Sequence, residues 1–171
     1  KLLDQILKIK KTKVAVVGGG VASFELAFSM IRRYKQNIDI TILGKKILAE
    51  NNLNNKIKKK LLKIANDLDI KILNEPVTHI SKKFITCKNG ETVESDLNLI
   101  STGACLQAWL SESELDKDEN GFFIVNNNLL SINNDDIFVT GDACSVINTP
   151  RSKSGVMAVR QGEILKENIF L

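Results

Sequence analysis

An apolar run that ends in three consecutive glycines constrains the fold of this chain more than any other feature. The run is Val14 to Val17, and Gly18-Gly19-Gly20-Val21-Ala22-Ser23 follows it directly. A short continuous apolar run is typical of a buried strand in a parallel sheet. The glycines permit a sharp turn, and the residues from Val21 to about Tyr34 predict a helix. Strand, tight turn and helix in this order indicate an α/β fold.

The alternation of strands and helices continues along the first hundred residues. Ile38 to Leu43, Asp69 to Leu73 and Leu97 to Ser101 predict further strands, and Leu53 to Leu68 predicts a helix whose apolar face repeats every three or four residues (Leu53, Ile57, Leu61, Ile64 and Leu68). This order predicts a parallel sheet with right-handed crossovers and helices on its faces. Phe84 to Cys87 and Glu91 to Glu94 flank Lys88-Asn89-Gly90, which predicts a β-hairpin.

The character of the chain changes after Ala104. Ser111 to Gly121 is acidic, and Asn126 to Asp136 is rich in Asn and Asp, so both stretches are expected to be loops. Ile137 to Thr140 predicts a strand, and Gly155 to Phe170 predicts a closing helix. We therefore expect two domains, residues 1–104 and residues 105–171. A short amphipathic helix around Leu2 to Leu7, followed by the basic run Lys8 to Lys13, is expected at the start.

Composition excludes several classes of protein. A net charge of +4 with only 5% aromatic residues gives neither the basic patch nor the stacking surface that nucleic-acid binding needs. No apolar run reaches the roughly 18 residues of a membrane span, and no signal peptide is recognisable. Cys87, Cys105 and Cys144 are widely spaced, form no metal or redox pair, and fit a reducing compartment such as the cytoplasm. We expect His79, the single histidine, to be structural.

The glycine triplet has the chemistry of a dinucleotide site. Gly18 allows the turn, Gly20 lets the backbone approach a pyrophosphate, and the helix amides and dipole favour the anion. Ser23 stands where a third glycine commonly allows close packing of helix and strand, which predicts slightly looser packing. The alternative is a tight strand-to-helix turn with no ligand.

The end of the second strand is expected to face the adenosine ribose. That position is Gly44, followed by Lys45 and Lys46. Asp39 lies at the start of the strand, about 13 to 16 Å away at about 3.3 Å per residue, and cannot reach the ribose. No carboxylate selects NADH there, and the lysines can accept a 2′-phosphate, so NADH and NADPH both remain open. Replacing Gly44 with Asp is expected to favour NADH. The alternative is that both lysines contact only solvent.

Two further motifs follow in the second half of the chain. Ser101-Thr102-Gly103-Ala104 places a small turn at a strand end, where the backbone can pass close to a cofactor or cross between domains. Ile137 to Thr140 leads into Gly141-Asp142-Ala143, which puts a carboxylate at the carboxyl edge of a sheet, where α/β proteins bind ligands. Taken singly, each motif is equally compatible with an ordinary turn.

Together these three motifs resemble the pyridine nucleotide-disulfide oxidoreductase superfamily. The resemblance implies a complete, Rossmann-like nicotinamide-nucleotide domain followed by the carboxy-terminal segment of an FAD domain, with FAD and NAD or NADP as cofactors. It also implies that Asp142, after Gly141, binds the ribityl chain of the flavin. Thr102 and Gly103 would mark the crossover between domains, and Glu25 would lie near the nicotinamide.

The tail from Pro150 to Gly162 is similar to NADH dehydrogenase-like flavoproteins related to type II NADH dehydrogenases, especially those fused to selenide, water dikinase. In such proteins the amino end of the last helix points at the flavin. The likeness therefore implies that Gly155 and Val156 lie at the flavin and that the helix dipole stabilises reduced flavin. The alternative, compatible with this, is that Val156, Val159, Ile164 and Ile169 form a core face.

The implied activity is hydride transfer from NAD(P)H to FAD, which needs no side chain as a general acid or base. The resemblance leaves the final acceptor open between a quinone, a selenium or sulfur species and another protein, and it leaves contact with a membrane surface open.

The chain departs from the family in two respects. It lacks the amino-terminal glycine loop for FAD, and it has no redox cysteine pair. Separately, the sequence opens at Lys1 rather than Met. We therefore expect a fragment without a complete active site that binds FAD weakly alone. Cys105 and Cys144 are expected to be small buried residues. The rival hypothesis is a non-catalytic nucleotide-binding or interaction module.

Overall fold

The computed structural model describes residues 11–49, 53–149, 151 and 153–169. The chain divides into two compact units, residues 1–102 and residues 103–171. The helix expected around Leu2 to Leu7 lies outside the described residues, as do Lys8 to Lys10 of the expected basic run and Phe170 at the end of the closing helix.

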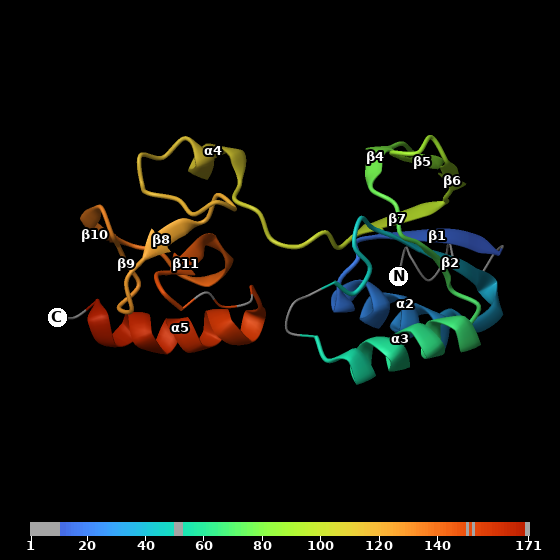
Figure 1. Cartoon of the computed structure of the whole chain (residues 1–171), viewed down its shortest axis with the longest axis horizontal. Helices are drawn as coiled ribbons and strands as arrows, with labels where there is room; N and C mark the ends of the chain where they lie inside the picture. The colour runs from blue at the N-terminus through green and yellow to red at the C-terminus, as the bar shows by residue number, and fades with distance from the viewer. Residues whose placement is uncertain (1–10, 50–52, 150, 152, 170–171) are drawn as a thin grey trace. The chain divides into compact units, whose positions relative to one another are not determined.

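A four-stranded parallel sheet forms the centre of the first unit (Figure 1). Its order is β3-β2-β1-β7, made of β3 (Lys71–Leu73), β2 (Ile38–Leu43), β1 (Thr12–Val17) and β7 (Leu97–Ile100). The pairs β1–β2, β1–β7 and β2–β3 are all parallel, which confirms the predicted α/β class. Because parallel strands end at the same edge, the segments that follow β1, β2 and β7 meet there.

Helices cover one face of this sheet and a small antiparallel sheet covers the other (Figure 1). On the first face, side chains of β1 and β2 pack with α2 (Val21–Tyr34) and α3 (Asn55–Asp67) through a buried cluster that includes Val16, Ile40, Phe24 and Ala65. On the second face, Val17 and Leu43 pack with Ile85 and Cys87. These two belong to the sheet of β4 (Val77–Ile80), β5 (Phe84–Cys87) and β6 (Thr92–Glu94). The short helix η1 (Lys35–Asn37) leads from α2 into β2.

The predicted hairpin is present, because β5 and β6 pair antiparallel around the turn that contains Gly90. The expected apolar face of α3 is only partly right. Leu53 and Leu68 lie outside the helix, and Ile57 is 49% exposed, whereas Leu61 and Ala65 pack on the core. The helix starts where the Asn54 side chain accepts a hydrogen bond from the Lys56 N–H, which caps it.

The second unit packs one long helix against a small mixed sheet (Figure 1). The sheet has the order β10-β9-β8-β11, made of β10 (Asn134–Phe138), β9 (Leu130–Ser131), β8 (Phe123–Val125) and β11 (Cys144–Val146). Strand β11 pairs with β8 in parallel, and the other pairs are antiparallel. Helix α5 (Gly155–Asn168) contributes Ile164 and Leu165 to the core around Val125 and Val146. The short helices α4 (Ala108–Ser111) and η2 (Gly141–Ala143) complete the unit.

The sequence prediction was wrong in part of this unit. The strand expected at Ile137 to Thr140 is instead Asn134–Phe138, and β9 and the start of β10 lie within the stretch expected to be a loop. Asn side chains there form hydrogen bonds with neighbouring residues and so stabilise the turn. Asn133, for example, accepts a hydrogen bond from Ser131 and donates to the carbonyl oxygen of Glu114. Within the described ranges, no helix is both long and apolar enough to cross a membrane.

Candidate functional site

The glycine loop is tied to the ends of two neighbouring strands. The Gly18 N–H donates to the Leu43 carbonyl oxygen at 2.7 Å, and the Leu48 N–H donates to the Gly19 carbonyl oxygen at 2.7 Å. On the other side, the Ser101 N–H donates to the Val17 carbonyl oxygen at 2.7 Å. The loop is therefore held between the segments that follow β2 and β7, at the carboxyl edge where α/β sheets bind ligands.

Side chains cannot be added to the first two loop glycines without moving the backbone. A Cβ on Gly18 would lie 2.0 Å from the carbonyl oxygen of Ser101, and one on Gly19 would lie 2.6 Å from that of Lys46. Gly18 also has φ +149°, a conformation that side-chain-bearing residues rarely adopt. Both positions need glycine for packing, whether or not a ligand binds.

The start of α2 differs from that of an ordinary surface helix. Its N-cap is Gly20, no side chain caps it, and no acidic residue stands in its first turn. The amino ends of α3 and α5, by contrast, are capped by Asn54 and Ser154. Helix amides that lack a side-chain cap, together with the positive end of the dipole, form a favourable site for an anion.

Ser23 adds a second indication at the same place. It is fully buried, and its Oγ has no hydrogen-bond partner in the described part of the chain. A buried hydroxyl without a partner costs free energy, so such atoms are rare and commonly face a bound group or water. The oxygen lies 2.8 Å from the Cβ position of Gly18, directly at the loop. The serine is thus a polar group at the loop rather than a mere loosening of the packing.

The segment after β2 requires a correction. Gly44 is buried, and a Cβ there would lie 2.7 Å from the backbone nitrogen of Gly19. Gly44 therefore packs against the glycine loop, and Asp in its place would displace the loop instead of offering a carboxylate to a ribose. Lys45 and Lys46 are exposed. Asp39 is paired with Lys11 at 2.8 Å, at the opposite end of β2.

The remaining candidates on α2 and after β7 are exposed or half-buried. Ala22 and Glu25 are exposed on α2, Val21 is half-buried, and Thr102 and Gly103 are exposed after β7. Ile100 at the end of β7 is 66% exposed. The structure therefore brings together the glycine loop, Gly44, the backbone of Lys46 and Ser101 at one edge. Lys45 stands between Gly44 and Lys46, and Glu25 lies beyond the first turn of α2.

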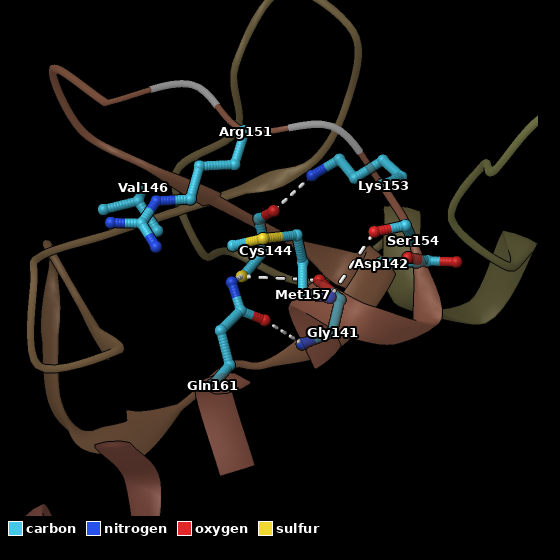
Figure 2. A pocket seen from close by; sticks show the side chains of 9 residues that line it. All are labelled: Gly141, Asp142, Cys144, Val146, Arg151, Lys153, Ser154, Met157 and Gln161. Atoms are coloured by element: carbon cyan, nitrogen blue, oxygen red, sulfur yellow. Dashed lines mark hydrogen bonds between the residues drawn. The ribbon is translucent and has the colours of Figure 1, made fainter. Parts of the chain in front are cut away.

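The Gly141-Asp142 turn forms part of a small hollow in the second unit (Figure 2). The lining residues are Gly141, Asp142, Cys144, Val146, Arg151, Lys153, Ser154, Met157 and Gln161. The Asp142 carboxylate is exposed, and the hydroxyl of Ser154 accepts a hydrogen bond from the Met157 N–H at 3.4 Å, which caps α5. The Lys153 ammonium bonds the Cys144 carbonyl oxygen and lies 3.9 Å from the centre of the Phe122 ring.

Sequence reasoning missed Gln161, which reaches from α5 to this turn. It is only 5% exposed, and its Oε1 accepts a hydrogen bond from the Gly141 N–H at 2.6 Å. A buried glutamine in a closing helix is a weak signal in a sequence, because glutamine is normally a surface residue.

The core face expected along α5 is wrong for most of its members. Val156 is 64% exposed, Val159 is 72% exposed and Ile169 is 53% exposed, whereas Ile164 does pack on the core. Gly155 is exposed as well, and neither Gly155 nor Val156 lines the hollow beside Asp142. The first turns of α5 thus present an uncovered apolar surface within the described residues.

The cysteines and the histidine show no metal or redox arrangement. Cys87 and Cys144 are buried, and burial is the main cause that raises the pKa of both thiols. Cys105 is exposed, so the expectation that it is buried was wrong. His79 lies exposed in β4. No cluster that could hold a metal ion occurs among the described residues.

Comparison with known proteins gives matches over most of the chain. Residues 3–162 match the family model described as pyridine nucleotide-disulphide oxidoreductase. The chain is 30% identical over 163 residues to ferroptosis suppressor protein 1 of Xenopus tropicalis, an alignment that covers 86% of this chain and 43% of that protein.

Solved structures show the same fold. The water-forming NADH oxidase from Lactobacillus brevis, bound to NADH, superposes with a TM-score of 0.77 at 22% identity, covering 98% of this chain and 38% of that one. A FAD-dependent pyridine nucleotide-disulphide oxidoreductase from Desulfovibrio vulgaris gives a TM-score of 0.73 at 22% identity, covering 93% of this chain and 42% of that one. The chain therefore spans less than half the length of the relatives that it matches.

Proposed function

Because this chain belongs to the pyridine nucleotide-disulphide oxidoreductase family, we propose that it forms the NAD(P)H-binding unit and part of the FAD site of a flavoprotein oxidoreductase. The reaction is hydride transfer from NAD(P)H to FAD and onward to a further acceptor. The observation that carries the proposal is the start of α2, where a tightly packed glycine loop leads into a helix with no side-chain cap beside the unpartnered Ser23 hydroxyl.

In the first unit the chain binds and orients the nucleotide. The pyrophosphate lies over the amino end of α2, where Gly20 leaves room for it and the helix dipole favours its charge. Lys45 lies at the adenosine ribose and Glu25 lies near the nicotinamide, whereas Thr102 and Gly103 mark the crossover between the domains. The rigid contacts of Gly18, Gly19 and Gly44 hold this loop in place before the nucleotide arrives, which lowers the entropic cost of binding.

In the second unit the chain contributes to the flavin site. The exposed Asp142 carboxylate accepts hydrogen bonds from the hydroxyls of the ribityl chain, after the turn set by Gly141. The amino end of α5, with Gly155 and Val156, faces the flavin ring, and the dipole of this 14-residue helix stabilises negative charge on the reduced cofactor. The exposed side chains of Val156 and Val159 exclude water there when the site is filled. The bound flavin itself supplies the redox chemistry.

The solved relatives support both nicotinamide nucleotides as partners. One Lactobacillus oxidase is bound to NADH, and an engineered form of it, matching this chain at a TM-score of 0.76 and 22% identity, is bound to NADPH. One framework thus accepts either nucleotide after a few substitutions. In this chain no carboxylate follows β2, so we propose weak discrimination, below about a hundredfold or roughly 2.7 kcal/mol.

Replacing Lys45 with Glu tests this ribose-side assignment. The change places a negative charge where a 2′-phosphate would bind, so NADPH affinity should fall relative to NADH affinity by about tenfold or more, an effect that salt weakens. Titration of nucleotide fluorescence at low ionic strength measures the ratio. The matched control is Lys82→Glu, since Lys82 is equally exposed but lies between β4 and β5. An unchanged NADH-to-NADPH ratio in Lys45→Glu would show that this lysine contacts only solvent.

Replacing Asp142 with Ala tests the flavin-side assignment. A charge-assisted hydrogen bond is worth about 1.5 to 3 kcal/mol, so FAD affinity of the flavin-loaded protein should fall about tenfold to a hundredfold. Asp142→Asn keeps an acceptor oxygen and should lose less. NADH affinity should be unchanged in both variants. Asp135→Ala, an exposed carboxylate in β10, is the control. Full flavin retention by Asp142→Ala would remove Asp142 from the site.

The remaining parts of the proposal concern the whole protein. We propose that residues outside this chain complete the FAD site, because the chain corresponds to 38 to 43% of the two relatives cited first. The acceptor beyond the flavin is a quinone, a selenium or sulfur species or another protein, and peripheral contact with a membrane stays open. The three free thiols fit the reducing cytoplasm.

A second candidate function is a nucleotide-binding module without electron transfer. The exposed apolar side chains at the start of α5 favour this second function if they bind another protein instead of a flavin. Such a module binds NADH at the α2 loop with the same dependence on Gly20, but it carries no flavin. Flavin content therefore separates the two functions, and nucleotide affinity does not.

A further inference from the structure

A closed set of hydrogen bonds holds the Gly141-Asp142 turn against α5 (Figure 2). The Gly141 N–H donates to Gln161 Oε1 at 2.6 Å, and Gln161 Nε2 donates to Cys144 Sγ at 3.1 Å. The Cys144 thiol donates in turn to the Gly141 carbonyl oxygen at 3.4 Å. Both backbone polar groups of Gly141 are thus engaged by two side chains that lie far apart in the sequence.

The orientation of the glutamine amide follows from its partners. A backbone N–H can only donate, so Gln161 must present its carbonyl oxygen to Gly141, which leaves the NH₂ group to face the sulfur. Gln161 is 5% exposed and Cys144 is 3% exposed. Burial raises the pKa of the Cys144 thiol, which keeps the sulfur protonated and able to donate. Because both side chains are buried, loss of one partner leaves polar groups that have little access to water and no protein partner.

Besides these side-chain bonds, the backbone N–H of Cys144 donates to the Gly141 carbonyl oxygen. Gly141 adopts φ +67°, and the position of a Cβ on it would lie 3.7 Å from the Ala158 Cβ on α5. The side chain of Thr140, the residue before η2, does not cap this short helix, and Asp142 itself is exposed. The hydrogen bond from Gly141 to Gln161 therefore fixes the residue that immediately precedes Asp142, and it ties that residue to the helix whose amino end lies beside the same hollow.

We propose that Gln161 is a positioning residue, which sets where the Asp142 carboxylate is presented to the flavin by holding the Gly141 N–H and the Cys144 thiol together. The inference rests on the proposed flavin-binding role of Asp142. Both polar atoms of the Gln161 amide are engaged by Gly141 and Cys144, so we assign this residue a positioning role and no contact with the reacting atoms. Its effect is transmitted through the backbone of Gly141, so it should be visible only while Asp142 is able to bind the flavin.

The test compares FAD dissociation constants of the full-length protein, which supplies the rest of the proposed FAD site, in a double-mutant cycle. Gln161→Leu removes both hydrogen bonds at similar volume and should weaken FAD binding about tenfold. In an Asp142→Ala background the same change should alter the FAD dissociation constant less than about twofold, because the two residues act through one contact. Gln161→Glu keeps the acceptor for Gly141 and should restore binding to within about threefold of wild type. Glu163→Ala, exposed on the same helix, is the control.

Two further readouts separate the possible failures. Amide hydrogen exchange at Gly141 should be faster in Gln161→Leu, and NADH affinity should be unchanged. If FAD affinity in Gln161→Leu equals that of wild type, or if the loss is the same in the Asp142→Ala background, the positioning role is overturned while the proposed function stands. If the wild-type protein binds no FAD, the proposed function fails as well. Should Gln161→Leu unfold, Gln161→Asn, which is too short to span both partners, takes its place in the cycle.

Discussion

Gly20→Val should abolish tight nicotinamide-nucleotide binding and leave the fold intact. Gly20 is the N-cap of α2 with φ −81° and ψ 174°, an extended conformation that valine adopts readily, so the backbone needs no glycine there. The branched side chain instead occupies the space over the first helix amides that a pyrophosphate requires. We expect NADH and NADPH affinity to fall by about a hundredfold or more, which corresponds to roughly 2.7 kcal/mol.

Two measurements on the same samples distinguish a loss of nucleotide binding from a loss of folding. Titration calorimetry gives the nucleotide dissociation constant, and in thermal unfolding Gly20→Val should melt within a few degrees of wild type. Gly162→Val is the matched control, because Gly162 lies on α5 with nothing within 4 Å of its Cβ position. Nucleotide affinity equal to wild type in Gly20→Val would mean that the site at α2 has been assigned wrongly.

Gly18→Ala should have the opposite signature, a large loss of stability. The added Cβ would lie 2.0 Å from the Ser101 carbonyl oxygen and 2.8 Å from Ser23 Oγ, and alanine is strained at φ +149°. The Ser101 oxygen belongs to the backbone that follows β7 and cannot yield without disturbing the sheet. We expect the free energy of unfolding of the first unit to fall by about 3 kcal/mol or more, which lowers Tm by about 15 °C.

Gly90→Ala separates the two causes of that loss. Gly90 also has a positive φ, +86°, but nothing lies within 4 Å of its Cβ position, so only backbone strain remains. It should cost about 1 kcal/mol. Denaturant unfolding of the three proteins measures the difference. If Gly18→Ala were no less stable than Gly90→Ala, the tight packing of the loop between β2 and β7 would be incorrect.

The parallel sheet and the glycine loop could be predicted because both leave a local signal in the sequence. Val14 to Val17 and Ile38 to Leu43 are apolar runs of strand length, and the glycines stand between a strand and a helix. Each signal arises within a few residues of the structure that it specifies. The details around the loop could not be predicted, because they depend on contacts between segments far apart in the sequence.

Gly44 and Leu48 are two positions whose conformation or packing depends on such distant contacts. The clash that a Cβ on Gly44 would make with Gly19 exists only once the segments after β1 and β2 lie side by side. Leu48, buried with φ +50°, donates the hydrogen bond that holds Gly19, and nothing in its residue type indicates a left-handed conformation. Tertiary packing overrides the local preference of the chain at both positions.

The second unit was harder to predict because its strands are short and polar. Asn134 to Asp136 begin β10 although Asn and Asp normally favour turns, since these side chains lie at or near the surface on an edge strand. Along α5 the apolar pattern predicted the wrong buried residues. Val156 and Val159 are exposed, whereas the polar residue Gln161 is buried. A helix that serves a binding site departs from simple amphipathic patterning, and this departure is itself consistent with the proposed flavin contact.

The most direct test of hydride transfer is anaerobic mixing of NADH with the flavin-loaded protein, followed by the visible absorbance of oxidised flavin. Wild-type protein should lose this absorbance as NADH is consumed, with one flavin reduced per nucleotide. Gly20→Val, loaded with the same flavin, should lose it about a hundredfold more slowly at low NADH concentration. A fully loaded wild-type protein whose flavin absorbance is unchanged by both NADH and NADPH would contradict the account.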